Sequence, residues 1–61
     1  MKLEVITNFT TLGKRRLMLF GDILFAEKDS FGDLSLFSYK DRKYKGYIKS
    51  SDQKKYLKII E

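Results

Sequence analysis

Residues 34–49 (LSLFSYKDRKYKGYIK) constrain the fold more than any other part of this chain. Apolar and polar side chains alternate over residues 34–39 and again over residues 43–49, on either side of the polar pair Asp41-Arg42. A two-residue period is typical of a strand with one buried face, and a short polar break between two such segments is typical of a hairpin. We therefore expect residues 34–39 to pair antiparallel with residues 43–49.

The second segment of this hairpin has two chemically different faces. A regular strand over residues 43–49 places Tyr44, Gly46 and Ile48 on one face, and Lys43, Lys45, Tyr47 and Lys49 on the other. The two tyrosines are then expected on opposite faces, with Tyr44 in the core. Tyr47, on the lysine face, is the better candidate to stack on a nucleic-acid base.

Shorter apolar segments predict further strands. Residues 3–9 read as a first strand, and residues 56–60 (YLKII) end the chain as a strand or as the extension of a helical turn. Between residues 17 and 27, Gly21-Asp22 is either a two-residue hairpin turn or the bend that leads into a strand over residues 23–27. We favour the bend, because the family resemblance described below has one at this point.

Polar segments separate these strands. Residues 10–16 and 28–33 contain glycine and several charged residues, which is typical of loops and turns. Ser50-Ser51-Asp52 offers a capping side chain for one helical turn at residues 53–55. We find no internal repeat and no linker.

The length of 61 residues predicts one domain, residues 1–61, with a small core. A domain of this size buries only about 60% of the surface that its unfolded chain exposes, so a deep cleft is not expected. The apolar residues of the predicted strands form the expected core: Leu17, Leu19, Ile23, Phe25, Leu34, Leu36, Ile48, Leu57 and Ile59.

The absence of cysteine and histidine excludes several classes of chemistry. Without them there is no disulfide, no thiolate or imidazole metal site and none of the common nucleophile–base pairs. Asp22 and Asp33 stand beside glycines as turn residues, without a second catalytic group. We expect no enzyme activity, no cofactor and no metal.

No apolar run approaches the roughly 20 residues of a membrane span. Glu4 and Asn8 interrupt the apolar stretch that a signal peptide requires near the N-terminus. We therefore expect a cytoplasmic protein that does not contact a membrane.

The charge is basic and unevenly placed. The chain has 13 basic and 8 acidic residues, and its net charge is +5. Residues 40–58 hold eight basic and two acidic residues, whereas residues 17–33 hold one basic and four acidic residues. This separation favours an acidic partner for one face.

Several segments together resemble an SH3-type barrel. GDILF resembles the Gly-Asp and apolar strand that follow the first long loop of bacterial SH3 domains. KGYIKSS followed by YLKII resembles their glycine-tyrosine strand, short helical turn and closing strand, and EVITNF lies where eukaryotic SH3 domains carry an aromatic motif. The resemblance implies an all-β (mainly β) fold, a small five-stranded SH3-like barrel with one short helical turn before the last strand.

Two departures and a second resemblance bear on function. The chain has no tryptophan and no proline, so it lacks the aromatic-lined groove with which SH3 domains bind proline-rich peptides, and such a ligand is not expected. Residues 37–61 are also similar to the second hairpin and C-terminal segment of the small archaeal chromatin proteins. That likeness implies binding of duplex DNA from the face of a three-stranded sheet, and it leaves a helix after Ser51 open.

Two hypotheses for the function follow. The first is a small non-enzymatic, nucleic-acid-associated module, whose cations neutralise phosphates and whose tyrosines stack on bases. The second is a protein–protein module or small regulator of the phage or mobile-element type, docking on an acidic surface of a host protein. A third, weaker option is an SH3-like module for cell-wall or peptide ligands. The candidate binding residues are Lys14, Arg15, Arg16, Tyr39, Arg42, Lys43, Lys45, Tyr47, Lys49, Lys54 and Lys55.

Overall fold

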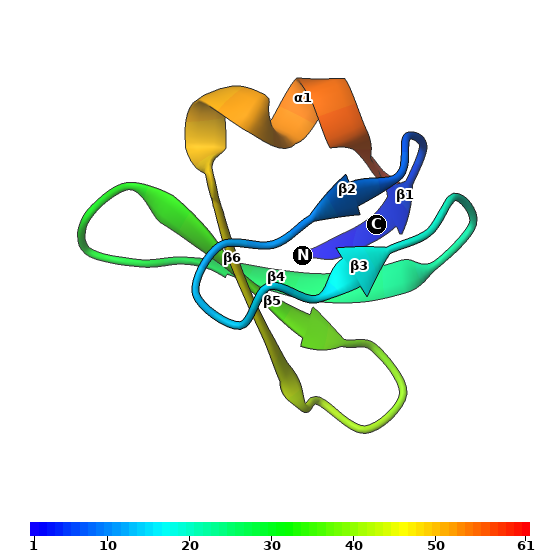
Figure 1. Ribbon diagram of the computed structural model, residues 1–61, viewed down its shortest axis with the longest axis horizontal. Coiled ribbons are helices and arrows are strands. Elements are labelled where there is room, and N and C mark those ends of the chain that lie inside the picture. Colours follow the sequence, from blue (N-terminus) through cyan, green and yellow to red (C-terminus); the bar gives the residue numbers. More distant parts are fainter.

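The computed structural model describes residues 1–61, and most of its regular structure is β (Figure 1). The strands are β1 (Lys2–Val5), β2 (Phe9–Thr10), β3 (Leu17–Met18), β4 (Ile23–Lys28), β5 (Asp33–Ser38), β6 (Tyr44–Lys49) and β7 (Leu57–Ile59). The 3-10 helix η1 (Ser50–Asp52) and the helix α1 (Gln53–Tyr56) lie between β6 and β7. No helix is long and apolar enough to cross a membrane.

Five strands form one antiparallel sheet in the order β6-β5-β4-β1-β7, and β2 and β3 form a separate two-stranded hairpin. The mainly-β fold with one short helical turn before the last strand is therefore confirmed. The hairpin predicted from the two-residue period is also confirmed, because β5 pairs with β6. In Figure 1 the β2–β3 hairpin lies in front of the larger sheet.

The expected first strand is divided in two. The chain changes partners after β1: the Val5 amide donates to the Asp22 carbonyl oxygen, and the Ile6 amide donates to that of Tyr56. It then turns away from the large sheet, so that Phe9 and Thr10 pair with β3 instead. Residues 3–9 are consequently not one strand.

The bend at Gly21-Asp22 is confirmed. Gly21 has φ +94°, its amide donates to the Val5 carbonyl oxygen, and β4 begins two residues later. The alternative of a two-residue hairpin is wrong, because β3 pairs with β2 and β4 pairs with β1 and β5.

The C-terminal segment combines the two alternatives left open by the sequence. Tyr56 ends the helix and Leu57 begins β7. The Tyr56 ring is stacked on Phe9 of β2 at a centroid distance of 4.8 Å, and this contact holds α1 against the β2–β3 hairpin. Asp52 precedes α1 but makes no side-chain capping hydrogen bond, so the predicted cap is not formed.

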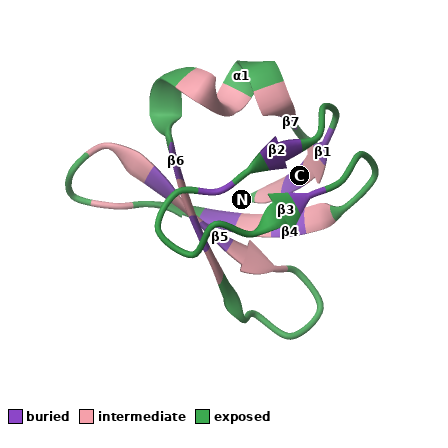
Figure 2. Ribbon diagram, viewed as in Figure 1, coloured by how far each residue is buried: buried purple, intermediate pink, exposed green.

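The core lies between the large sheet and the β2–β3 hairpin (Figure 2). Leu34, Leu36, Ile48 and Leu57 are buried as expected. The full cluster is Leu3, Val5, Phe9, Met18, Leu24, Ala26, Leu34, Leu36, Ile48 and Leu57.

The other five core predictions are wrong: Leu17, Leu19 and Ile59 are exposed, and Ile23 and Phe25 are half-buried. In β4 the buried residues are Leu24 and Ala26, opposite Ser38 and Leu36 of β5. The segment ILFA is apolar on both faces, so its pattern cannot show which face is inside.

A β-bulge changes the direction of side chains in β6. Leu36 lies opposite Gly46, but the next residue of β5, Phe37, lies opposite Tyr44, so Lys45 is an extra residue in β6. Tyr44 and Tyr47 therefore both lie on the outer face, and the prediction that Tyr44 belongs to the core is wrong.

The same strand supports the loop between β2 and β3. The buried Thr11 hydroxyl donates to the Lys45 carbonyl oxygen at 2.7 Å and accepts from the Arg16 amide at 2.9 Å. Leu12 and Tyr47 exchange both backbone hydrogen bonds, at 2.8 and 3.1 Å. We call this contact, made by Thr11, Leu12, Gly46 and Tyr47, the crossing.

Candidate nucleic-acid interface

The outer face of the β4–β5–β6 sheet carries a row of aromatic rings. Phe25 of β4 lies opposite Phe37 of β5, and Phe37 lies opposite Tyr44 of β6. The ring centroids are 6.2 Å and 5.6 Å apart, with tilted planes. Tilted pairs at such distances are favourable. The three rings therefore form one continuous surface across three strands.

Two cations and a fourth ring extend this row. The Arg42 guanidinium lies 3.9 Å from the centroid of Phe25 and 5.6 Å from that of Tyr39. The Lys2 ammonium lies 4.6 Å from the Tyr39 centroid. Cation–π contacts at exposed sites contribute about 0.5–1 kcal/mol each. We call the surface made by Lys2, Phe25, Phe37, Tyr39, Arg42 and Tyr44 the aromatic face.

The turn between β5 and β6 positions Arg42. Arg42 has φ +60°, and its amide donates to the Ser38 carbonyl oxygen at 2.8 Å. Asp41 accepts a hydrogen bond from the Lys43 amide at 3.2 Å, and this bond lowers the pKa of the Asp41 carboxyl. The turn is thus fixed by its own hydrogen bonds in a shape that places the guanidinium over Phe25.

The remaining candidate residues of β6 are less available for binding a ligand than the sequence predicts. The Tyr47 ring lies against the loop, where a Cβ on Gly13 would be 3.1 Å from Tyr47 Cε1. Lys49 forms an ion pair with Asp33 at 3.6 Å. Lys45 lines a pocket of about 310 Å³ and does not lie among the aromatic rings. Of the tyrosines, Tyr39 and Tyr44 offer the more exposed rings.

The other predicted cations form two separate groups. Lys14, Arg15 and Arg16 are exposed in the loop between β2 and β3, and none of them forms an ion pair. Lys54 and Lys55 lie on α1, which Figure 1 shows at the opposite end of the molecule from the β5–β6 turn. The structure therefore does not bring all the predicted binding residues together.

Two acidic residues limit the positive part of the aromatic face: Glu61 forms an ion pair with Lys2 at 3.9 Å, and Glu27 lies on the same side of the sheet. Glu27 follows Phe25 by two residues on the same side of β4, opposite Ser35. The cations Lys2, Arg42 and Lys43 lie toward the other end of the sheet, near the β5–β6 turn. An anionic ligand is consequently favoured at the turn end.

Sequence reasoning missed Lys2, Phe25, Phe37 and Tyr44 as parts of this surface. Phe37 was recognisable, because it alternates with the core residues Leu34 and Leu36. No local signal identified Lys2, which reaches Tyr39 only because β1 pairs with β4.

No protein-family model, curated protein or solved structure matches this chain.

Proposed function

We propose that this chain is a small non-enzymatic module that binds nucleic acid through the aromatic face. The observation that supports this most directly is the contact of three rings on the outer face of one sheet, to which Arg42 joins a fourth ring, Tyr39, with Lys2 as a second cation over Tyr39. Nucleic-acid-binding surfaces of this kind combine aromatic rings that stack on bases with cations that neutralise phosphates.

The chemistry of the face favours single-stranded nucleic acid of any sequence. Base–aromatic stacking contributes about 1–3 kcal/mol per base and needs bases that are not already stacked in a duplex. The exposed Tyr44 and Tyr39 rings offer this contact, and Arg42 keeps its N–H groups free of any carboxylate. The face has no asparagine or glutamine that could read the edge of a base.

We also infer that the fold is an SH3-like barrel. The sheet order β6-β5-β4-β1-β7, the Gly-Asp bend and the short helical segment before β7 support this assignment. We propose a cytoplasmic location as well, since RNA is found there in every cell.

The test measures binding of a fluorescent thymidine oligonucleotide of about 12 nucleotides by anisotropy at low salt. We expect Tyr44→Ala to weaken binding by about 5–150-fold, because this corresponds to the loss of one stacked base. Arg42→Ala should weaken it as well, through the loss of a phosphate contact.

Phe31→Ala is the matched control. Phe31 is the most exposed aromatic residue, at 88%, and it lies in the turn between β4 and β5 without any ring contact. Its removal should leave affinity unchanged. Equal effects of Tyr44→Ala and Phe31→Ala, or no binding at about 50 mM salt, where the electrostatic contribution is strong, would refute the proposal.

A further inference from the structure

Strand β3 has one edge that no other strand covers. It pairs with β2 alone. The Thr11 amide donates to the Arg16 carbonyl oxygen at 2.9 Å, and Phe9 lies opposite Met18. Hydrogen-bonded and non-hydrogen-bonded pairs alternate along an antiparallel ladder, so the pair between them, Thr10 and Leu17, is not hydrogen-bonded. The N–H and C=O groups of Leu17 therefore point away from β2.

The uncovered edge is limited to the region of Leu17. Two residues further on, the Leu19 amide donates to the Asp22 carboxylate and the Leu19 carbonyl oxygen accepts from the Asp22 amide, both at 2.9 Å. Asp22 thus uses the backbone N–H and C=O groups of Leu19 that an added strand would need. The corresponding groups of Leu17 have no hydrogen-bond partner.

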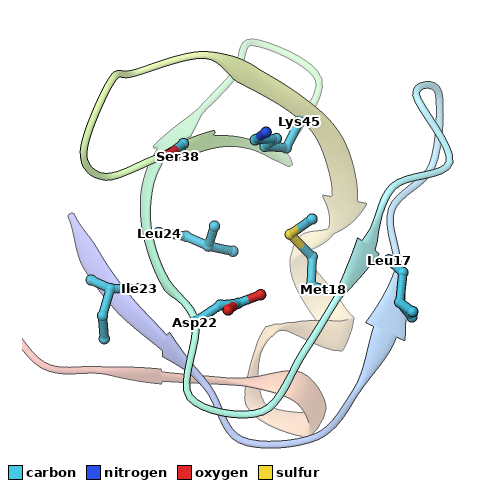
Figure 3. A pocket seen from close by; sticks show the side chains of 7 residues that line it. All are labelled: Leu17, Met18, Asp22, Ile23, Leu24, Ser38 and Lys45. Atoms are coloured by element: carbon cyan, nitrogen blue, oxygen red, sulfur yellow. The ribbon is translucent and has the colours of Figure 1, made fainter.

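A pocket of about 310 Å³ opens directly beside this edge (Figure 3). Figure 3 shows Met18 and Leu24 directed toward the inside of the ring of strands, while Leu17 points outward. Ser38, the last residue of β5, and Lys45, in the bulge of β6, also line the pocket. The pocket therefore lies between the free edge of β3 and the bulged part of β6.

The charges around the pocket favour an anion. Lys45 is half-buried and has no carboxylate within ion-pair distance. Arg15 and Arg16, next to the free edge, are exposed and also unpaired. The pocket has one carboxylate, Asp22, and the three cations outnumber it.

We propose that β3 binds an extended acidic peptide segment of a partner protein, which adds to the sheet as a strand. The peptide backbone exchanges two hydrogen bonds with Leu17, as in other complexes where a peptide joins a sheet edge. An apolar side chain of the peptide packs on Met18 and Leu24, and a carboxylate two residues along, on the same face of the peptide strand, binds Lys45. This site is separate from the aromatic face and does not depend on the nucleic-acid proposal.

The experiment uses the intact chain and blocked synthetic peptides of about nine residues, the length of a long strand. The first peptide has valine and glutamate in turn at every second position, with threonine between them, so that both share one face of the strand, and the second has lysine in place of every glutamate. The third is the glutamate peptide with N-methyl groups on alternate backbone nitrogens, which removes the donors of one edge. Binding is measured by anisotropy, and the Leu17 amide is followed by NMR hydrogen exchange.

We expect only the first peptide to bind, and its binding to slow exchange of the Leu17 amide by at least about tenfold. Lys45→Gln should weaken the complex by about tenfold, because it removes a charge-assisted hydrogen bond. Lys54→Gln on α1 is the matched control and should have no effect. Leu17→Pro removes an N–H that lies outside the β2–β3 ladder and should abolish binding, whereas Leu17→Ala keeps this N–H and should retain it.

Three results would overturn the proposal, and none of them needs a protein variant. The lysine peptide could bind as tightly as the glutamate peptide, or the N-methylated peptide could bind as tightly as the unmodified one. The Leu17 amide could also become protected without peptide as the protein concentration rises, which would assign this edge to a second copy of the chain.

Discussion

Gly46 occupies the most restricted backbone position of the molecule. Its φ is +112°, and a Cβ there would lie 2.5 Å from the Leu12 carbonyl oxygen and 2.6 Å from Thr11 Oγ1. Gly21 also has a positive φ, of +94°, but its surroundings are open. The two glycines therefore separate the cost of backbone conformation from the cost of a steric clash.

This comparison gives a prediction for stability. Gly21→Ala should reduce the free energy of unfolding by about 1–2 kcal/mol, the cost of a positive φ for an L-residue. Gly46→Ala should reduce it by at least about 3 kcal/mol, because the new Cβ also forces the crossing apart. Denaturant unfolding followed by circular dichroism measures both values, and equal losses would contradict the clash at Gly46.

Asp41 provides a prediction for pH dependence. The hydrogen bond from the Lys43 amide favours the ionised carboxylate and lowers the pKa of Asp41 in the folded chain. NMR titration should therefore place it below the ordinary value of about 3.9. A carboxyl whose pKa is depressed by folding stabilises the fold above its unfolded pKa, and this contribution is lost as the pH falls through the folded pKa.

Asp41→Asn is the matching variant. It should remove this part of the acid dependence, and the turn should then be equally ordered at low and neutral pH. An Asp41 carboxyl that titrates at or above the ordinary value would show that the bond from Lys43 is not formed in solution.

At the scale of elements, the strands differ in how far the sequence predicts them. The β5–β6 hairpin follows from its alternation, because Leu34 and Leu36 leave only one choice of buried face. The buried face of β4 does not follow, since Leu24 and Phe25 are both apolar. Which face of β4 is buried depends on how β4 pairs with β1 and β5, and the sequence of β4 alone does not contain this information.

The candidate site shows the same limit. Tyr39 and Arg42 are recognisable from the sequence, because an aromatic ring and a cation beside a predicted turn can bind a base and a phosphate. The structure places both on the aromatic face. The bulge at Lys45 is not recognisable, because it accompanies the approach of Thr11 and Leu12, more than 30 residues earlier in the chain. A local pattern cannot show where a distant loop will cross a strand.

The crossing makes a prediction for the β2–β3 hairpin as an element. Thr11→Val keeps the shape of the side chain but leaves the Lys45 carbonyl and the Arg16 amide without their partner. We expect a loss of about 2–3 kcal/mol in the free energy of unfolding, because both groups are partly buried. Thr11→Ser keeps the hydroxyl and should cost only about 1 kcal/mol for the lost methyl group.

Denaturant unfolding of the two variants measures the difference. If Thr11→Ser is as unstable as Thr11→Val, the methyl group and not the hydroxyl holds the loop on β6.

At the scale of the whole molecule, the positive charge is divided among three places. One is the turn end of the aromatic face, the second is the loop of residues 14–16, and the third is α1. Single-stranded nucleic acid bound to the aromatic face can reach the first group of cations directly. It reaches the loop of residues 14–16 only if it runs along β6 toward Tyr47, and α1 lies beyond this path.

The salt dependence of binding should report how many groups take part. The affinity of a single strand falls with a log–log slope of about −0.7 for each neutralised phosphate. Replacing Lys14, Arg15 and Arg16 together by alanine should make the slope less steep if the strand follows this path. Replacing Lys54 and Lys55 should leave the slope unchanged, and a change there would place the nucleic acid on α1 instead.

The position of β1 between β4 and β7 has a consequence for the kinetics of folding. The β4–β5 and β5–β6 pairs join neighbours along the chain, whereas β1 pairs with β7 through contacts such as Leu3 with Ile59. Contacts between residues so far apart cost more loop entropy and form later. Stopped-flow measurements should therefore show Ile48→Val slowing folding, and Leu57→Ala mainly accelerating unfolding. The lifetime of the native state would then be controlled by how long β7 stays attached to β1.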